Sequence, residues 1–311
     1  MKRFTFSLLI FLISQSFCSS QKIIEISYEK DAFNNYVFYC DNKDLCKYSV
    51  EVNFSGMFNL TSEYTFPHRF DVSTGRIKLF VLKPSIDNSP SSFNASYKYV
   101  RGGLNPRVKR DFVYLLPVGN GKETEAMEMK YIKLNEKDPE PKDWYAIGFK
   151  MKFHDTVYAA RGGLVTDLQD TIKLKLSGYS YSSDDNFVQI YHEDGTFGRY
   201  QVLSKVLVKS GEKVNAGEPI GLAGGDKYEN GPHVRFSVHY NFEPDIVDKK
   251  FKAKANSYLW AYIPVIFYTK EFKNIPLTAG NKYIAEYPES VVTKEMSNRE
   301  IKKWKKENNI L

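Results

Sequence analysis

The sequence has few cysteines, no second long apolar run and no strong excess of charge. Three of its 311 residues are cysteine, and one of these, Cys18, lies in an apolar segment at the N-terminus. No later stretch approaches the roughly 20 apolar residues that a membrane-spanning helix needs, so we expect no transmembrane helix in the mature chain. The formal charge of +7 is small and scattered, which argues against a nucleic-acid partner.

The first twenty residues have the features of an export signal. Lys2 and Arg3 precede an apolar run over residues 4–17, and the small residues Ser19 and Ser20 follow it. We therefore predict a signal peptide over residues 1–20 and an exported protein, either periplasmic, in the cell envelope or secreted. A lipid anchor on Cys18 is the less favoured alternative, because residues 15–17 make a poor lipoprotein recognition sequence.

Two cysteines remain in the mature chain, six positions apart. Cys40 and Cys46 flank a stretch rich in turn-forming residues. In an oxidising compartment this spacing favours a disulfide that closes a small loop. A zinc pair is less favoured, because no further Cys or His lies near enough in the sequence to complete four ligands.

Residues 21–110 predict an immunoglobulin-like β-sandwich. Short runs of β-branched and aromatic residues alternate with Asn, Asp, Gly and Pro at regular intervals. The aromatic side chains of Tyr36, Phe38 and Tyr39 could line a ligand face, but core packing is the favoured interpretation. Residues 101–110 are basic and rich in Gly and Pro, and we expect them to form a linker.

Residues 111–270 predict a second β-rich domain. Its most specific local pattern places apolar residues and glycines alternately at every third position, at Val208, Gly211, Val214, Gly217 and Ile220. Because glycine permits the positive φ of tight turns, the pattern indicates short strands that fold back sharply, as in barrel-sandwich hybrid domains. Carrier domains that bear lipoyl or biotin share this motif, but no clear lysine at a hairpin tip is present.

Residues 271–311 form a C-terminal extension in this interpretation. Ser297 and Glu300 have the spacing of a capping box and open a basic helix. The lysines could contact a wall or membrane surface. The favoured interpretation is a solvated face beneath which Ile301 and Trp304 dock.

Several motifs in residues 112–242 occur in an order that resembles the lysostaphin or LytM family of peptidoglycan metallo-endopeptidases. They comprise residues 112–117 (FVYLLP), 156–165 (TVYAARGGLV), 186–192 (NFVQIYH), 199–203 (RYQVL), the glycine pattern, and 231–236 (GPHVRF). The resemblance implies that the second domain has the LytM-type barrel-sandwich fold. It also implies a zinc ion held by two histidines and an aspartate, which lowers the pKa of its bound water toward about 7. Two further histidines would assist proton transfer and oxyanion stabilisation.

This chain has lost most of those residues. The family's His-x-x-x-Asp motif falls on Trp144 and Gly148, its Tyr-x-His-Leu motif places Val202 at a catalytic histidine, and its His-x-His motif falls on His233 and Arg235. All three zinc positions are replaced, and an arginine repels a cation. We therefore expect no metal, with zinc as the cofactor only if the domain is active. His233 remains as a remnant of the catalytic set.

Other polar residues could in principle rebuild a metal site. The nearest in sequence are His154, Asp155, His192, Glu193, Asp194 and His239. Relocating a whole site is rarer than losing it, so this alternative is less favoured. Arg235, Tyr200 and Trp144 are the residues expected to line a ligand-binding groove, where Arg235 suits a carboxylate.

The leading hypothesis is an exported, non-catalytic protein that binds peptidoglycan or regulates a cell-wall hydrolase. An active zinc endopeptidase with relocated ligands is the first alternative. The second is a surface adhesion or carbohydrate-binding protein in which the N-terminal sandwich binds the ligand and the second domain is a scaffold.

Overall fold

A computed structural model describes residues 22–131, 141–173, 185–243 and 259–310. The predicted signal peptide, with Cys18, lies outside the described residues. Strands dominate the described part of the chain, and its two α-helices lie near the C-terminus. No helix among these residues is long and apolar enough to cross a membrane. The predicted all-β class is confirmed.

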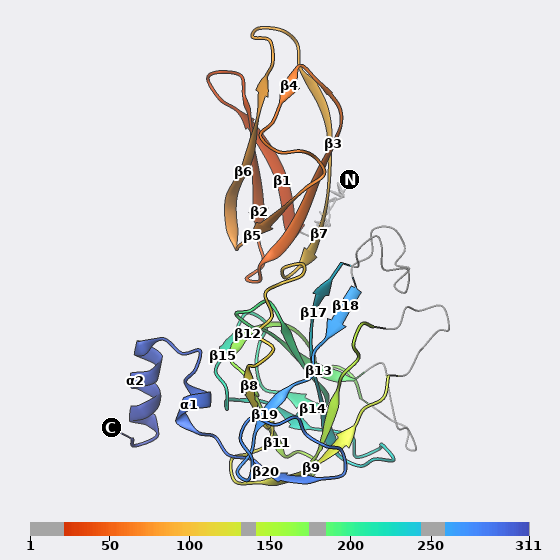
Figure 1. Ribbon diagram of the computed structural model, residues 1–311, viewed down its shortest axis with the longest axis vertical. Coiled ribbons are helices and arrows are strands. Elements are labelled where there is room, and N and C mark those ends of the chain that lie inside the picture. Colours follow the sequence, from red (N-terminus) through yellow and green to blue (C-terminus); the bar gives the residue numbers. More distant parts are fainter. Residues whose placement is uncertain (1–21, 132–140, 174–184, 244–258, 311) are drawn as a thin grey trace, which may run out of the picture.

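The N-terminal sandwich consists of two antiparallel sheets that pack face to face (Figure 1). Their strand orders are β1-β2-β6-β4 and β5-β3-β7. The strands are β1 (Ile24–Lys30), β2 (Tyr36–Asn42), β3 (Tyr48–Phe58), β4 (Leu60–Thr61), β5 (His68–Val72), β6 (Gly75–Pro84) and β7 (Ser92–Arg101). Buried and half-buried residues alternate along β2, as the two-residue period of a strand requires. Tyr36 and Phe38 lie in the core, as expected, and the Phe38 ring stacks on Phe80.

The two cysteines of this sandwich are buried and free. The predicted disulfide is therefore not formed, and polar contacts close the loop instead. The side-chain amide of Asn42 donates to the Cys46 carbonyl at 2.9 Å, and Asp44 accepts the Cys46 N–H at 3.2 Å. Burial raises the pKa of the Cys40 thiol to about 11 and that of Cys46 to about 12, so both stay protonated and pack as small apolar groups.

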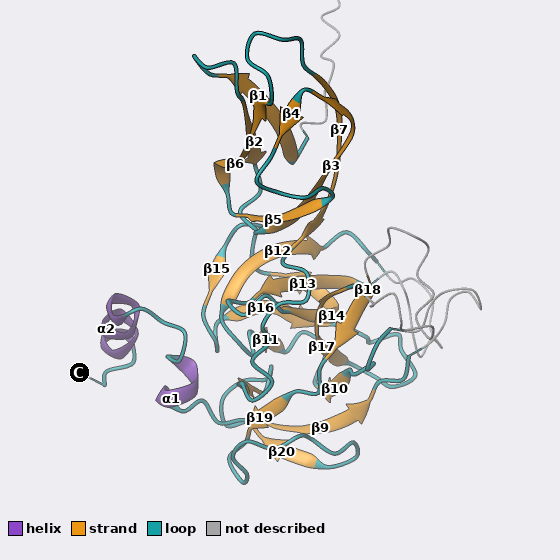
Figure 2. Cartoon of the chain, turned by 45° about the horizontal axis from the view of Figure 1, so that its top comes forward, coloured by secondary structure: helices purple, strands orange, loops and turns teal. Residues whose placement is uncertain are grey.

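A large sheet contains most of the remaining strands (Figure 2). Its order is β15-β12-β13-β14-β17-β10-β9-β20, with β11, β16 and β18 paired at its sides. The strands are β9 (Glu123–Glu128), β10 (Ile147–Lys150), β11 (Thr156–Tyr158), β12 (Gly163–Gln169), β13 (Asn186–Tyr191), β14 (Phe197–Val206), β15 (Lys213–Val214), β16 (Pro219–Ala223), β17 (His233–Phe242), β18 (Leu259–Tyr262) and β20 (Lys282–Ile284). A parallel pair, β8 (Val113–Leu115) and β19 (Ile266–Tyr268), lies beside it. Because β17 is central, all its residues but the last are buried.

The glycine pattern forms the turns predicted for it. Gly211 precedes β15 with a φ of 86°, and Gly217 precedes β16 with a φ of 85°. A side chain at either position would be held in the left-handed region, which costs an L-residue about 1–2 kcal/mol. The prediction of short strands that fold back sharply is confirmed.

The start of the predicted linker packs tightly between the N-terminal sandwich and the large sheet. The Asn241 side chain donates to the Arg101 carbonyl at 2.5 Å, and the Arg101 guanidinium donates to the Thr166 carbonyl at 3.1 Å. At Gly102, a Cβ atom would lie 2.8 Å from the Phe197 ring, so only glycine fits this junction. Phe197 of β14 itself packs into the core of the N-terminal sandwich.

The C-terminal segment folds back onto the large sheet before it forms two helices (Figure 1). Strand β20 pairs with β9, and helix α1 (Glu289–Val292) packs Val291 and Val292 against β8 and β19. Helix α2 (Asn298–Glu307) opens with the predicted capping box, in which Ser297 and Glu300 bond each other's backbone N–H. Trp304 packs against the same small cluster as α1, as the favoured interpretation expected, whereas Ile301, which was expected to dock with it, is not part of that cluster.

Candidate functional site

A cavity of about 490 Å³ opens where β9, β14, β17 and β18 meet. Its lining residues are Glu128, Met129, Lys130, Tyr131, Pro141, Trp144, Arg199, Gln201, Asn230, Arg235, Trp260 and Tyr262. Two of the residues predicted to line a groove, Trp144 and Arg235, are among them. Lys130, Arg199 and Arg235 are cationic and Glu128 is the one carboxylate in this set, so the lining favours an anionic ligand.

The strand register brings together two positions that the family resemblance assigned to zinc ligands. Gly148 of β10 lies directly opposite Arg235 of β17, and Gln201 of β14 lies opposite Arg235 on its other side. The alignment of motifs far apart in the sequence is therefore geometrically consistent. Neither Gly148 nor Arg235 can donate a lone pair to a metal.

Met129 fills the space beside Gly148. A Cβ atom at position 148 would lie 2.2 Å from the Met129 methyl carbon, and the Trp144 indole N–H donates to the Met129 carbonyl at 2.9 Å. The Met129 thioether thus fills the space where the family resemblance puts the carboxylate of an aspartate, and the Trp144 indole stands where it puts an imidazole. Among the described residues, no three His, Cys, Asp or Glu side chains are grouped so that they could hold a metal ion. The residues present here do not fit zinc.

Arg235 is 6% exposed and faces a buried carboxylate. Its Nη1 lies 3.8 Å from Asp185 Oδ2, and the Tyr228 hydroxyl donates to Asp185 Oδ1. Sequence reasoning missed Asp185 and Tyr228, because they lie outside every family motif. An acidic residue directly before a buried strand was the only signal that could have pointed to Asp185.

His233 is fully buried and neutral. Its Nδ1 lies 2.8 Å from the Gly231 carbonyl, while its Nε2 has no hydrogen-bond partner among the described residues. Burial, aided by the charge of Arg235, holds the pKa of the imidazole below its usual range. His233 does not line the cavity, and its contacts are those of a structural strand residue.

Tyr200 also lies away from the cavity. It is 0% exposed, its ring packs on Phe236, and its hydroxyl accepts the Ala160 N–H at 2.8 Å. Burial raises the pKa of this phenol above its usual range. The structure therefore places Tyr200 in the core, where it fixes the strand connection at Ala160, rather than in the predicted groove.

Val202 keeps an unusual backbone at the position where the family carries a catalytic histidine. Its φ is 67°, a left-handed conformation that is rare for a β-branched residue. Its carbonyl accepts the Gly224 N–H at 2.8 Å, and its side chain lies close to Gly225. An isopropyl group here supplies no group for proton transfer.

The alternative zinc ligands do not form a metal site among the described residues. His154 stacks on Phe153 in a turn, whereas His239 packs between Phe197 and Trp260. His192 is buried, with its Nδ1 2.8 Å from the Gly162 carbonyl. His192 lies near Asp194, but among the described residues no third side chain joins them to complete a group that could hold a metal ion.

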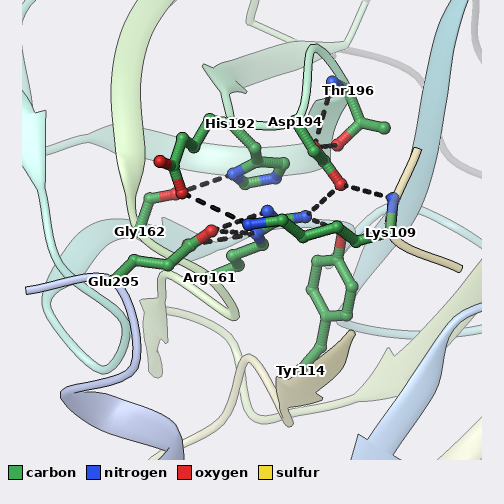
Figure 3. Close-up of polar contacts among 9 residues, drawn as sticks. Lys109, Tyr114, Arg161, Gly162, His192, Asp194, Thr196 and Glu295 are labelled. Carbon is green, nitrogen blue, oxygen red and sulfur yellow. Dashed lines mark hydrogen bonds and ion pairs between the residues drawn. The ribbon is translucent and has the colours of Figure 1, made fainter. Parts of the chain in front are cut away.

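A second polar cluster surrounds Arg161, which is 0% exposed (Figure 3). Its guanidinium donates to Glu295 at 2.6 and 3.1 Å, to Asp194 at 3.0 Å and to the Tyr114 hydroxyl at 3.1 Å. Asp194 also accepts the Lys109 backbone N–H. Glu295 comes from the segment between α1 and α2, so this cluster fastens the C-terminal segment to the large sheet.

Comparison with known proteins finds a family for part of the chain. Residues 142–245 match the model of peptidase family M23. A peptidoglycan DD-endopeptidase, ShyA, of Vibrio cholerae is 43% identical over 53 residues, which are 17% of this chain and 12% of that protein. An uncharacterized metalloprotease of Buchnera aphidicola is 40% identical over 53 residues, or 14% of its length. The chain thus matches only a small part of these relatives.

Solved structures give a weaker likeness. The catalytic domain of lysostaphin from Staphylococcus simulans is 24% identical, with a TM-score of 0.27, over 38% of this chain and 78% of that one. A zinc-containing peptidase from Vibrio cholerae is 15% identical, with a TM-score of 0.29, over 69% of this chain and 82% of that one.

Replacing Glu295 with alanine should destabilise the protein strongly. The change removes a carboxylate partner of the buried Arg161 guanidinium. Breaking a buried ion pair in this way lowers the free energy of unfolding by about 3–5 kcal/mol. The free energy of unfolding in denaturant measures the effect. Glu193→Ala is the matched control, because that carboxylate is exposed and, among the described residues, its ion pair is with the exposed Lys109. Equal losses in the two variants would contradict the role given to Glu295.

Acidification should weaken the fold before most carboxylates titrate. Burial lowers the pKa of His192 and of His239 to about 3, helped by Arg161 and Arg199 respectively. Below about pH 6.5 the unfolded chain therefore binds protons that the folded chain does not. Each histidine then removes up to about 1.4 kcal/mol of stability per pH unit until its folded pKa is reached. Denaturant unfolding at about pH 7 and about pH 5 tests this, and equal stabilities would contradict it.

Proposed function

We propose that this protein binds peptidoglycan peptides without hydrolysing them, because residues 142–245 match the model of peptidase family M23. The observation that carries the proposal is the cationic cavity lined by Arg235, which takes the place of one zinc ligand in the family resemblance. Gly148, at the place of a second ligand, lies opposite Arg235 on the neighbouring strand. A guanidinium attracts a carboxylate but has no coordination position from which to activate water. Binding is therefore the activity that this geometry supports best.

The ligand group that suits the cavity is a peptide carboxylate, and peptidoglycan stem peptides carry such groups. Arg235 supplies a charge that is fixed on the central strand β17, with Asp185 as a buried neighbour. Arg199 lies on β14 and is held over the Phe187 ring, with its centre 3.6 Å from the ring centroid. Two positioned guanidinium groups give a carboxylate both charge and directional hydrogen bonds.

Binding to peptidoglycan also fits the proposed export of the chain, because that polymer lies outside the cytoplasmic membrane. The N-terminal sandwich packs directly on the large sheet through Phe197 and Arg101. We propose that it acts as a rigid spacer that presents the cavity to the wall, while its own described residues supply no catalytic group.

Replacing Arg235 with alanine should abolish most binding of a soluble peptidoglycan stem peptide. The loss of a charged hydrogen-bonding group costs about 1.5–3 kcal/mol, so affinity should fall roughly tenfold to a hundredfold. Isothermal titration calorimetry measures this. Arg235→Lys should retain part of the affinity, since it keeps the charge but not the bidentate geometry.

Arg76→Ala provides the matched control, because that arginine is exposed on the N-terminal sandwich and pairs with Glu29. Melting temperatures of all variants identify any loss of folding. Unchanged binding by Arg235→Ala would contradict the proposed site. Release of soluble fragments from peptidoglycan by the parent protein would contradict its lack of hydrolysis.

A further inference from the structure

The cavity has an aromatic wall that the carboxylate site does not explain. Tyr131, Trp144, Tyr262 and Trp260 all line it. The ring centroids of Tyr131 and Trp144 are 5.1 Å apart, and those of Trp144 and Tyr262 are 4.6 Å apart. His239 continues the series, at 5.6 Å from Tyr262 and 4.6 Å from Trp260. The rings thus form one continuous series of contacts, and they come from four separate chain segments.

The wall offers ring surface rather than polar ring atoms. The Trp144 indole N–H is already bonded to the Met129 carbonyl, so this residue presents its ring to a ligand. Trp260 packs on His239 and is nevertheless 47% exposed. A large aromatic ring that is supported by a neighbour and left open to solvent is a ready stacking platform.

Groups of mixed hydrogen-bonding character lie around this platform. Gln201 and Asn230 each carry an amide that can both donate and accept, and Glu128 adds a carboxylate that accepts. A ligand that suits this lining has one flat apolar face and an edge with alternating donors and acceptors. A pyranose ring has this form, because its axial C–H groups make an apolar face and its hydroxyl and acetamido groups surround it.

Two other ligand classes fit less well. An organic cation would suit the aromatic rings but would meet Lys130, Arg199 and Arg235 in the same cavity. An apolar side chain would bury its surface best in a closed pocket, whereas Trp260 is half open to solvent.

We propose that the aromatic wall binds an N-acetylated pyranose ring, so that the cavity holds a sugar beside the carboxylate contacted by Arg235. This inference rests on the proposed function, since it assigns the glycan part of the same polymer to the same cavity. Trp260 and Trp144 form the stacking surface, and the amides of Gln201 and Asn230 pair with the acetamido and hydroxyl groups. The N-terminal sandwich has no part in this subsite.

The test is calorimetric titration of the full protein with a peptide-free tetramer of β-1,4-linked N-acetylglucosamine. The parent should bind it saturably, and Trp260→Ala should bind at least about tenfold more weakly, which corresponds to about 1.4 kcal/mol. Trp304→Phe is the matched control and should bind like the parent, because Trp304 lies on α2 and does not line the cavity. Melting temperatures show whether each variant folds.

The outcomes separate this inference from the proposed function. Absence of saturable binding, or equal binding by Trp260→Ala and the parent, overturns the sugar subsite. If the stem peptide still binds in an Arg235-dependent way, the proposed function stands without it. Binding of the tetramer that depends on Trp260, together with no binding of the stem peptide, supports the subsite and overturns the carboxylate site instead.

Discussion

The buried guanidinium of Arg161 joins the C-terminal segment to the large sheet. Arg161 must find its counter-charges inside the protein, because an uncompensated buried charge costs several kcal/mol. It finds them in Asp194 and Glu295, and it also donates to Tyr114. Since Asp194 in turn accepts the backbone N–H of Lys109, the linker is held at the same point. The ion cluster of Arg161, Asp194 and Glu295 therefore holds both the linker and the C-terminal segment against the large sheet.

The other buried guanidinium of the sheet, Arg235, has a different consequence. It stands on the central strand, directly opposite Gly148 and beside a cavity. Both a metal ion and a guanidinium provide fixed positive charge, but only the metal ion can lower the pKa of bound water. Apolar side chains fill the space around Gly148, because Met129 packs beside it and the Trp144 indole is bonded to the Met129 backbone. In the proposed function, a guanidinium at this place retains attraction for anions but does not activate water.

Much of the fold could be predicted from short-range patterns. The capping box at Ser297 and the turns at Gly211 and Gly217 follow from local backbone requirements, which a single sequence displays directly. The motif alignment also placed Gly148 and Arg235 at related positions, and the register of β10 and β17 makes them neighbours.

The remainder depended on contacts between distant segments. Cys40 and Cys46 are free, and Asn42 and Asp44 bond the backbone of Cys46 in the loop, contacts that the spacing of the cysteines does not reveal. Tyr200 was expected in the groove, but its side chain lies in the core because its hydroxyl bonds the Ala160 backbone. The aromatic wall, with rings from separate segments, and the pairing of Asp185 with Arg235 became visible only in three dimensions.

The zinc content of the purified protein, measured by elemental analysis after dialysis against trace zinc, tests the exchange of metal for guanidinium most directly. Because the side chains at this site do not fit a metal ion, we expect the purified protein to contain almost no zinc per chain. A content close to one zinc per chain would contradict this account of the site, and His154, His192, His233 and His239 would then be the first residues to replace in a search for the ligands.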